Sequence, residues 1–412
     1  MFLLDNEVRR YAWGSHRVIA ELTNRPSPTA EPEAELWLGA HPDASSRARD
    51  LPGSPALCDL IKEEPEAHLG RVLNSEYHGR LPFLFKVLAA ESPLSIQAHP
   101  TAARARTGFA EENEAGIALS NAQRNYRDPF AKPELFVALS ECEVLCGFRG
   151  AQDAANILAR LGIRMLAPYV GSLLTGLPSD GLRVAVTTLL SMPKEKQREL
   201  AGRVVEESAR LVERLDDSDP DRKSYMWAIK LGEAYPGDIG VVLSLLLNLL
   251  VLQPWQGVYL GPGQLHAYLH GWGLEAQANS DNTLRGGLTP KHIDVAELLR
   301  VIDFESGPLV VIDPVVLGAE AGYDEGMTTW PTPAREFALY RRKISSEEVI
   351  VASDGPQILF CIEGSMKITS RDVVTELSKG ESVFVTAAQG SVTVSGDGVL
   401  TRVCAGRVIR SR

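Results

Sequence analysis

Residues 95–100 read Ser-Ile-Gln-Ala-His-Pro, and their alternation of polar and apolar side chains is that of a β-strand. One face carries Ile96 and Ala98, and the other carries Gln97 and His99. Polar side chains on the inner face of a half-buried strand cost free energy unless something satisfies them. A bound metal ion would satisfy both of them.

Two further segments repeat this pattern. Lys132 and Glu134 share a face of the run Ala-Lys-Pro-Glu-Leu-Phe. In the run Gly-Gln-Leu-His-Ala-Tyr-Leu-His, one face carries the alternate residues Gln264, His266, Tyr268 and His270. Nitrogen and oxygen donors of these types bind transition metals. The three segments therefore predict a mixed-ligand metal site built from Gln97, His99, Glu134 and His266.

The residue types leave two questions open at this site. A glutamine such as Gln97 can ligate a metal directly, or it can hydrogen-bond to a histidine that does. Two histidines and one carboxylate also describe non-haem iron sites, so the ligand types do not identify the metal.

The chain changes character along its length. Up to about residue 150, short apolar or alternating runs broken by Gly, Pro and Asp predict strands. From 152 to about 215, apolar residues recur at helical spacing, and we expect helices to continue through the apolar run 239–252.

Strand-like sequence returns at Gly257, and a helix is expected over 294–302, after Thr289-Pro290. Beyond about Pro308, short apolar runs alternate with turns rich in Gly and Asp, which is typical of an antiparallel sandwich or barrel.

The candidate ligands lie on both sides of the helical block, with His266 after it and the other three before it. One barrel interrupted by a helical insertion explains this most simply. We therefore predict a mainly β fold with an α-helical insert, divided into a catalytic barrel (1–150 and 256–307), an inserted helical domain (151–255) and a second C-terminal β-barrel (308–412). All eight histidines precede residue 293, so the second barrel has no histidine for a metal site.

Composition excludes several classes of function. A net charge of −11 argues against a general nucleic-acid partner, since a phosphate backbone demands a basic surface. The longest apolar run, 239–252, falls short of the roughly 20 residues that span a bilayer, so no membrane partner is expected. The five scattered cysteines and an N-terminus unlike a secretion signal predict a cytoplasmic protein.

Six segments in the same order resemble the type I mannose-6-phosphate isomerases, zinc enzymes of the cupin superfamily. Three of them contain the candidate ligands, in Gln97-Ala-His-Pro, Lys132-Pro-Glu and His266-Ala-Tyr. The others include Tyr11-Ala-Trp-Gly-Ser, Glu35-Leu-Trp-Leu-Gly-Ala-His-Pro and Asn279-Ser-Asp-Asn-Thr-Leu-Arg-Gly-Gly-Leu-Thr-Pro-Lys. The resemblance covers most of the chain and is looser toward the C-terminus.

The resemblance implies a cupin-type jelly-roll for the catalytic barrel and a second jelly-roll at the C-terminus. It implies one Zn²⁺ per chain, held by Gln97, His99, Glu134 and His266, with Arg285 as a catalytic residue and Lys291 close to it. It also implies a reaction, the interconversion of mannose 6-phosphate and fructose 6-phosphate through a cis-enediol. The segment Leu274-Glu275-Ala-Gln277 departs from the family's usual pattern without touching a presumed ligand.

Moving a proton between C1 and C2 of a sugar phosphate requires a base, an electrophile and a group that holds the phosphate. We predict Glu275 as the base, with a zinc-bound water or Lys291 as rivals. Substrate-binding candidates are Ser95, Lys86, Lys132 and Tyr268, and Arg285 and Lys291 also offer cationic contacts to the phosphate.

Other functions remain open at this point. The same fold and ligands could serve another sugar phosphate, an iron oxygenase or a non-enzymatic, metal-loaded sugar-binding cupin. We expect His41, His270, Trp13 and Trp37 to be structural. The oligomeric state is not determined by the sequence, and a monomer is compatible with it.

Overall fold

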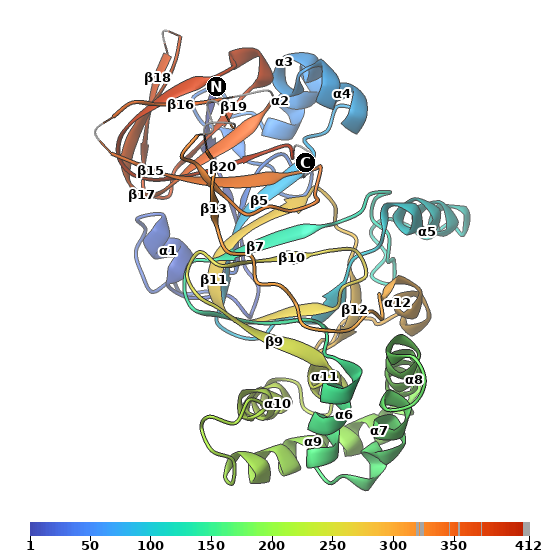
Figure 1. The fold of residues 1–412 in the computed structure, drawn as a ribbon. Helices are drawn as coiled ribbons and strands as arrows, with labels where there is room; N and C mark the ends of the chain where they lie inside the picture. The colour runs from blue at the N-terminus through green and yellow to red at the C-terminus, as the bar shows by residue number, and fades with distance from the viewer. Residues whose placement is uncertain (319–320, 322–324, 346, 353–354, 372, 407–412) are drawn as a thin grey trace.

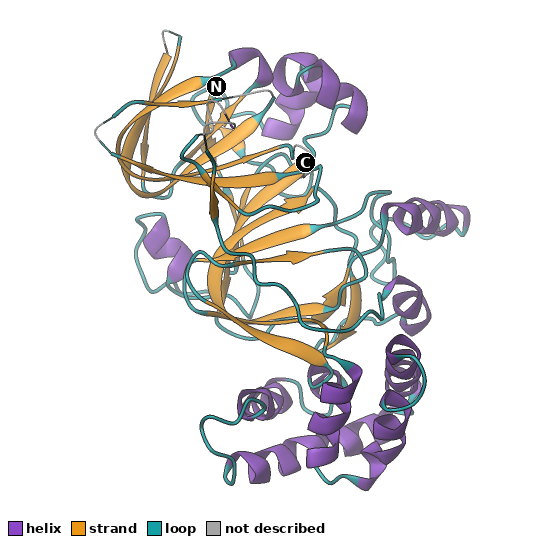
Figure 2. Ribbon diagram, viewed as in Figure 1, coloured by secondary structure: helices purple, strands orange, loops and turns teal. Residues whose placement is uncertain are grey.

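The computed structural model describes residues 1–318, 321, 325–345, 347–352, 355–371 and 373–406. In these ranges the strands form two antiparallel sheets of ten strands each, and a block of helices lies below the first sheet in the view of Figure 1. Figure 2 shows the same division, with a block of helices at the bottom of the view and further helices beside the two sheets. The predicted mainly β fold with a helical insert is confirmed.

The first sheet carries the candidate metal ligands. Its path is β10-β7-β11-β5-β3-β2, and the remaining four strands join it beside this path. The strands are β2 (Glu7–Arg9), β3 (Glu35–Leu38), β5 (Phe83–Ala90), β6 (Ile96–Ala98), β7 (Glu134–Ala138), β8 (Cys142–Phe148), β9 (Leu247–Leu252), β10 (Gly257–Leu260), β11 (His266–Ala278) and β12 (Leu284–Gly287).

The long strand β11 organises this sheet because it changes partners along its length. Its first residues pair with β8 and, at His266, with Gln97 of β6. From Gly271 onward it pairs with β5, which sets Glu275 opposite Lys86, and from Gly273 it also pairs with β7 on its other side. The strand β11 therefore carries both a candidate metal ligand, His266, and the candidate base, Glu275.

A glycine allows β11 to approach β7 closely. A Cβ at Gly273 would lie 2.3 Å from the carbonyl oxygen of Val137 and 2.7 Å from the ring of Phe136. We expect Gly273→Ala to lower the free energy of unfolding by about 1–3 kcal/mol, because backbone and a packed ring must both shift. Urea unfolding measures this change. Gly202→Ala is the control, since nothing lies within 4 Å of a Cβ there; a loss of equal size in the control would contradict the steric explanation.

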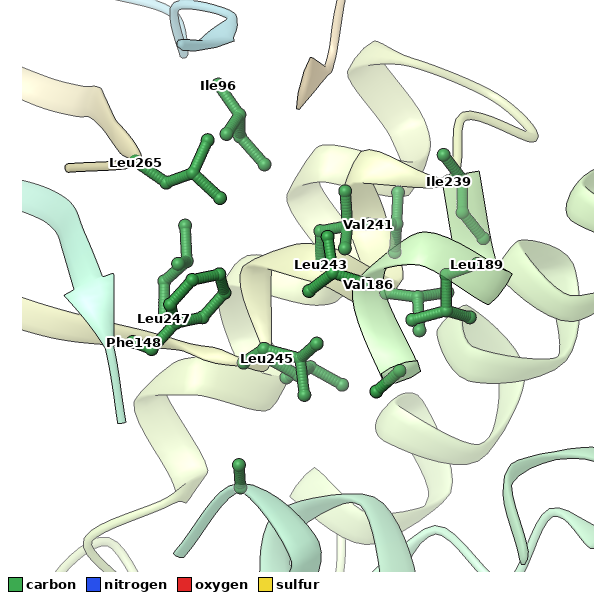
Figure 3. Packing of buried hydrophobic residues seen from close by; sticks show 14 of the residues in the cluster. Ile96, Phe148, Val186, Leu189, Ile239, Val241, Leu243, Leu245, Leu247 and Leu265 are labelled. Carbon is green, nitrogen blue, oxygen red and sulfur yellow. The ribbon is translucent and has the colours of Figure 1, made fainter. Parts of the chain in front are cut away.

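The helical block packs against the first sheet through one continuous apolar core. Figure 3 shows Val241, Leu243 and Leu245 of the block near Ile96 and Leu265 of the barrel. Ile96 faces this core because alternation along β6 turns it away from Gln97. The helices are α6 (Ala151–Arg160), α7 (Ala167–Leu173), α8 (Pro178–Ser191), α9 (Lys194–Val212), α10 (Arg222–Ala234), α11 (Gly240–Ser244) and the 3₁₀ turn η1 (Arg164–Leu166).

The apolar run 239–252 does not form the single helix that was predicted. Its first part is α11, but Leu247–Leu252 is the strand β9, which pairs with β8 along its length. An apolar run without periodicity fits a buried helix or a buried strand equally well, and here the free edge of β8 decides between them. Among the described residues, none of the helices combines the length and the apolar character needed to cross a membrane.

The second sheet contains the C-terminal strands together with two from the N-terminus. Its path is β13-β14-β15-β20-β17-β19-β1-β4, with β16 and β18 beside it. The strands are β1 (Phe2–Asp5), β4 (Arg47–Ala48), β13 (Val315–Val316), β14 (Thr328–Thr329), β15 (Ala338–Ile344), β16 (Val349–Val351), β17 (Gln357–Ser370), β18 (Val373–Ser378), β19 (Ser382–Val385) and β20 (Val392–Cys404).

The first strand, β1, belongs to the C-terminal sheet and not to the sheet that carries the candidate ligands. β1 pairs with β19, with Leu3 opposite Val383, so the N-terminus completes the C-terminal sheet. Leu3 and Val383 are 380 positions apart in the chain, a separation at which local sequence patterns do not encode pairing. The predicted domain boundaries stay predictions.

The remaining helices cover the sheets or close loops. They are α1 (Val18–Leu22), α2 (Leu57–Glu63), α3 (Pro65–Leu69), α4 (Arg71–Tyr77), α5 (Ala102–Glu114), α12 (Val295–Val301) and the 3₁₀ turn η3 (Ala387–Gln389). The predicted helix over 294–302 is confirmed as α12, and Asp294 caps it by accepting a hydrogen bond from the backbone of Glu297.

Candidate metal centre and active site

Three of the four predicted ligands form a compact buried group. Donor atoms of His99, Glu134 and His266 all lie within 4.8 Å of one another. The Nε2 atoms of the two histidines are each 3.4 Å from a carboxylate oxygen of Glu134. Strand ends meet here, because His99 follows β6, Glu134 begins β7 and His266 begins β11.

The side chains of this group are arranged to receive a cation. Nδ1 of His99 lies 2.7 Å from the carbonyl oxygen of Asn282, and Nδ1 of His266 lies 2.9 Å from that of Gln264. Donation of both Nδ1 protons to these carbonyls leaves the Nε2 lone pairs facing Glu134. Among the described residues, His99 Nε2 and Glu134 Oε2 are buried without a hydrogen-bond partner. A zinc ion fits these orphaned atoms and this donor set.

The protonation states agree with this arrangement. Burial, followed by the positive charge of Lys132, lowers the pKa of His99 to about 4, so its imidazole is neutral. Burial raises the pKa of Glu134, but the positive charge of Lys132 and the contacts of the carboxylate with His99 and His266 outweigh it and hold that pKa well below its usual range. The group therefore offers the neutral imidazole of His99 and the carboxylate of Glu134, the forms in which these side chains bind a metal.

Gln97 lies beside this group, with Nε2 3.3 Å from Nε2 of His266. In the pairing of β6 with β12, Gln97 lies opposite Arg285. Gln97 also borders the cavity of about 870 Å³ that contains the predicted substrate residues. Whether Gln97 is a direct ligand or supports His266 stays a prediction.

A second buried network surrounds Glu275. The hydroxyl of Tyr268 donates to Glu275 Oε1 at 2.8 Å, and Lys86 Nζ lies 3.3 Å from Oε2. Lys86 also lies 3.8 Å from Glu35 and 4.8 Å from the centre of the Trp37 ring. Lys86 is thus a cation held between two carboxylates and an aromatic face.

The pKa values of this network are shifted by burial and by its own charges. Burial lowers the pKa of Lys86, but the carboxylates of Glu35 and Glu275 outweigh it and raise that pKa, so the lysine stays charged. Burial, followed by the charge of Glu134, raises the pKa of Glu275. A carboxylate whose pKa is raised is a stronger base than an ordinary carboxylate, which suits it to exchanging protons with a substrate.

The predicted substrate residues line one cavity of about 870 Å³. It is bordered by Ser95, Lys86, Lys132, Tyr268, Glu275, Arg285 and Lys291, and by Gln97 and Glu134 of the metal site. Lys132 Nζ lies 3.1 Å from Glu134. The structure therefore brings every predicted catalytic and substrate-binding residue to the cavity that borders the metal site.

Arg285 and Lys291 both border the cavity, close enough for their positive charges to affect each other. Burial and the neighbouring charge of Arg127 lower the pKa of Arg285, and burial and Arg285 lower that of Lys291. Like charges gathered at a cavity wall repel one another and favour an anionic ligand. Arg127 was not among the predicted site residues, because no strand or motif pattern in the sequence points to it.

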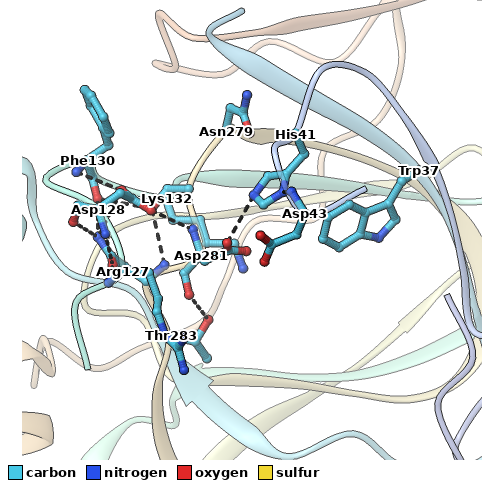
Figure 4. Close-up of polar contacts among 12 residues, drawn as sticks. Trp37, His41, Asp43, Arg127, Asp128, Phe130, Lys132, Asn279, Asp281 and Thr283 are labelled. Atoms are coloured by element: carbon cyan, nitrogen blue, oxygen red, sulfur yellow. Dashed lines mark hydrogen bonds and ion pairs between the residues drawn. The ribbon is translucent and has the colours of Figure 1, made fainter. Parts of the chain in front are cut away.

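Sequence reasoning also missed the residues that support the site. Asn282 is buried and accepts a hydrogen bond from the backbone of Arg127 at 2.7 Å while donating to the carbonyls of Asp128 and Phe130. Figure 4 shows Asp128 and Phe130 in this network of polar contacts, near Asp281. The segment Asn279-Ser-Asp-Asn contains several of these supports, so the motif itself was the available signal.

His41, Trp13 and Trp37 were expected to be structural. His41 is buried with Nε2 3.1 Å from Asp281, an interaction drawn in Figure 4, and its ring meets Trp37 edge-on. Both tryptophans line the cavity, and Trp37 also donates to Glu35 at 2.7 Å. These two aromatic residues are therefore part of the cavity wall as well as of the packing.

Comparison with known proteins agrees with the site. Residues 1–151 match a family model described as phosphomannose isomerase type I, catalytic domain, and residues 326–405 match the mannose-6-phosphate isomerase cupin domain. The mannose-6-phosphate isomerase of Escherichia coli is 37% identical over 97% of this chain and 98% of its own length. The human mannose-6-phosphate isomerase is 29% identical, with 98% of each chain covered.

Solved structures show the same architecture. A zinc-bound mannose 6-phosphate isomerase superimposes with a TM-score of 0.87 at 35% identity, covering 98% of this chain and 99% of its own. A further structure, bound with zinc and yttrium, has the same TM-score and identity. The full-length similarity, the shared fold and the buried His-Glu-His group show that this chain belongs to the type I phosphomannose isomerase family.

Proposed function

We propose that this protein is a zinc-dependent isomerase that interconverts mannose 6-phosphate and fructose 6-phosphate. The observation that carries the proposal is the single cavity in which the His99–Glu134–His266 group, the buried Glu275 and the cations Arg285 and Lys291 meet. An aldose–ketose isomerase needs these three parts, a polarising centre, a base and an anion site.

His99, Glu134 and His266 would hold one zinc ion per chain, and Gln97 is placed to complete the set. Bound zinc supplies Lewis acidity that polarises oxygen atoms of the sugar. The iron-oxygenase reading is disfavoured by the cations beside the site, which suit a phosphorylated substrate.

Glu275 acts as the base. Its carboxylate takes the proton from C2 of the open-chain aldose, and the C1–C2 double bond of the enediol forms as the C1 carbonyl oxygen gains a proton. The carbon-bound proton then returns at C1 while the C2 hydroxyl loses its proton, so that a hydroxyl proton has in effect moved from O2 to O1 and the ketose is formed. Tyr268 and Lys86 hold the carboxylate from two sides, which keeps it aimed at the reacting carbons.

The basic residues bind the charged parts of the substrate. Arg285 offers paired N–H donors to the enediolate or the phosphate, and Lys291 adds a compact charge next to it. Ser95 and Lys132 border the same cavity and contribute further polar contacts.

The proposal includes a cytoplasmic location and a free sugar phosphate as the partner, with no nucleic acid. The net charge of −11 argues against a nucleic-acid partner. The five scattered cysteines support the cytoplasmic location.

One experiment tests the function and the metal together. Zinc content is measured in the purified protein, and conversion of mannose 6-phosphate to fructose 6-phosphate is followed before chelation, after chelation and after zinc is restored. We expect about one zinc per chain, loss of conversion on chelation and recovery with zinc. Absence of conversion by a zinc-replete sample would refute the function, and conversion that survives complete metal removal would refute the metal's role.

A further inference from the structure

One polar atom at the cavity has no role in the chemistry described above. Gln277 lies on β11 two residues after Glu275, on the same face of the strand, and it lines the cavity with only 1% of its surface exposed. Its Nε2 donates to the carbonyl oxygens of Ala278 and Ser280, at 3.2 and 3.4 Å. Its Oε1 is buried and, among the described residues, has no hydrogen-bond partner.

The two carbonyls determine which way the amide points. A rotated amide would place Oε1 against the oxygens of Ala278 and Ser280, and neither can donate a proton. The amide nitrogen therefore occupies that side, and Oε1 points away from these two carbonyls, on a residue that borders the cavity.

An unsatisfied buried acceptor of this kind is unfavourable, because it has lost its hydrogen bonds to water and gained none in return. A ligand that donates a hydrogen bond to it removes that cost. The donor cannot be the phosphate, whose oxygens are acceptors, and the neighbouring carboxylates of Glu134 and Glu275 also repel an anion at this point. A neutral hydroxyl is the group that fits.

We propose that Gln277 is a specificity-determining residue whose Oε1 accepts a hydrogen bond from a sugar hydroxyl on C3 or C4. The inference rests on the proposed function, which assigns C1 and C2 to Glu275 and the phosphate on C6 to the cations. The C5 oxygen closes the ring of the pyranose that enters the site, so C3 and C4 carry the remaining donors. A sugar phosphate without the matching hydroxyl leaves Oε1 unpaired and is rejected.

A thermodynamic cycle tests this role. Gln277→Met keeps a similar volume and removes the acceptor, and Gln277→Leu serves as a second apolar variant. The kcat/KM of wild type and variants is measured with mannose 6-phosphate and with its 3-deoxy and 4-deoxy analogues. In wild type, we expect kcat/KM to be about tenfold lower for one analogue than for mannose 6-phosphate, which corresponds to roughly 1.4 kcal/mol. In the variants, we expect kcat/KM for that analogue to be close to kcat/KM for mannose 6-phosphate.

Asn279 provides a matched control on the same chain segment. Its Oδ1 is also buried without a partner in the described structure, but Asn279 does not line the cavity. Asn279→Leu is expected to move the unfolding midpoint and to leave the analogue-to-substrate ratio at the wild-type value. Zinc content and unfolding midpoint of every variant are recorded alongside.

The outcomes separate the inference from the function it rests on. Equal ratios in wild type and in both Gln277 variants, for both analogues, would overturn the role of Gln277 while mannose 6-phosphate conversion stands. Failure of the zinc-loaded wild type to convert mannose 6-phosphate would overturn the proposed function itself.

Discussion

Glu275→Gln is expected to lower kcat for mannose 6-phosphate by about 10²- to 10⁴-fold, the range typical for loss of a general base. The amide has nearly the same shape as the carboxylate, so KM should change far less than kcat. Tyr268 can still donate to the remaining carbonyl oxygen, which keeps the side chain in place. Both constants follow from steady-state kinetics.

Exchange of the C2 proton with solvent gives a more direct measurement. Wild-type protein in deuterated water should introduce deuterium at C2 of mannose 6-phosphate, and Glu275→Gln should slow this exchange in proportion to kcat. Tyr268→Phe is the matched control, because it removes the hydrogen bond at 2.8 Å and keeps the carboxylate. Exchange at the wild-type rate in Glu275→Gln would assign the base to another group, with Lys291 the first to test.

Glu134→Gln is expected to abolish tight zinc binding and, with it, the isomerase activity. The substitution removes the only charge among the three buried donors and can place an NH₂ group against the imidazole nitrogens. Loss of a group that merely supports a ligand weakens metal affinity by about 10- to 100-fold, so loss of a direct ligand should exceed that range. Competition with a chelator of known affinity measures the change.

Glu35→Gln is the control for this variant. Glu35 is also a buried carboxylate near Lys86, but it lies outside the metal group. We expect Glu35→Gln to keep zinc and Glu134→Gln to lose it. Equal zinc retention in the two variants after dialysis against chelator would contradict the assignment of Glu134 as a ligand.

The metal site was predictable from the sequence because the signal is local. A strand has a two-residue period, so Gln97 and His99 had to share a face, and Ile96 had to face the opposite way. The structure confirms this division, with Ile96 in the apolar core and Gln97 beside His266. The positions of Arg285 and Lys291 came from the resemblance to a known family rather than from any period in the chain.

The supports of the site could not be predicted in this way. Asn282 holds the segment 127–130 through side-chain hydrogen bonds. Its backbone carbonyl accepts a hydrogen bond from Nδ1 of His99. A backbone acceptor is available from any residue type, so no residue pattern reveals it. The partnerless Oε1 of Gln277 is likewise visible only once every neighbouring donor has a position.

By itself, the sequence determined which side chains turn inward, which segments are strands or amphipathic helices, and the family to which the motifs point. The tertiary structure alone decided that Leu247–Leu252 is a strand beside β8 and that β1 completes the C-terminal sheet. The physical reason is the range of the interactions. Side-chain periodicity is set within a few residues, whereas the partner of a strand edge or of a buried polar atom is chosen by hydrogen bonds between segments far apart in the chain.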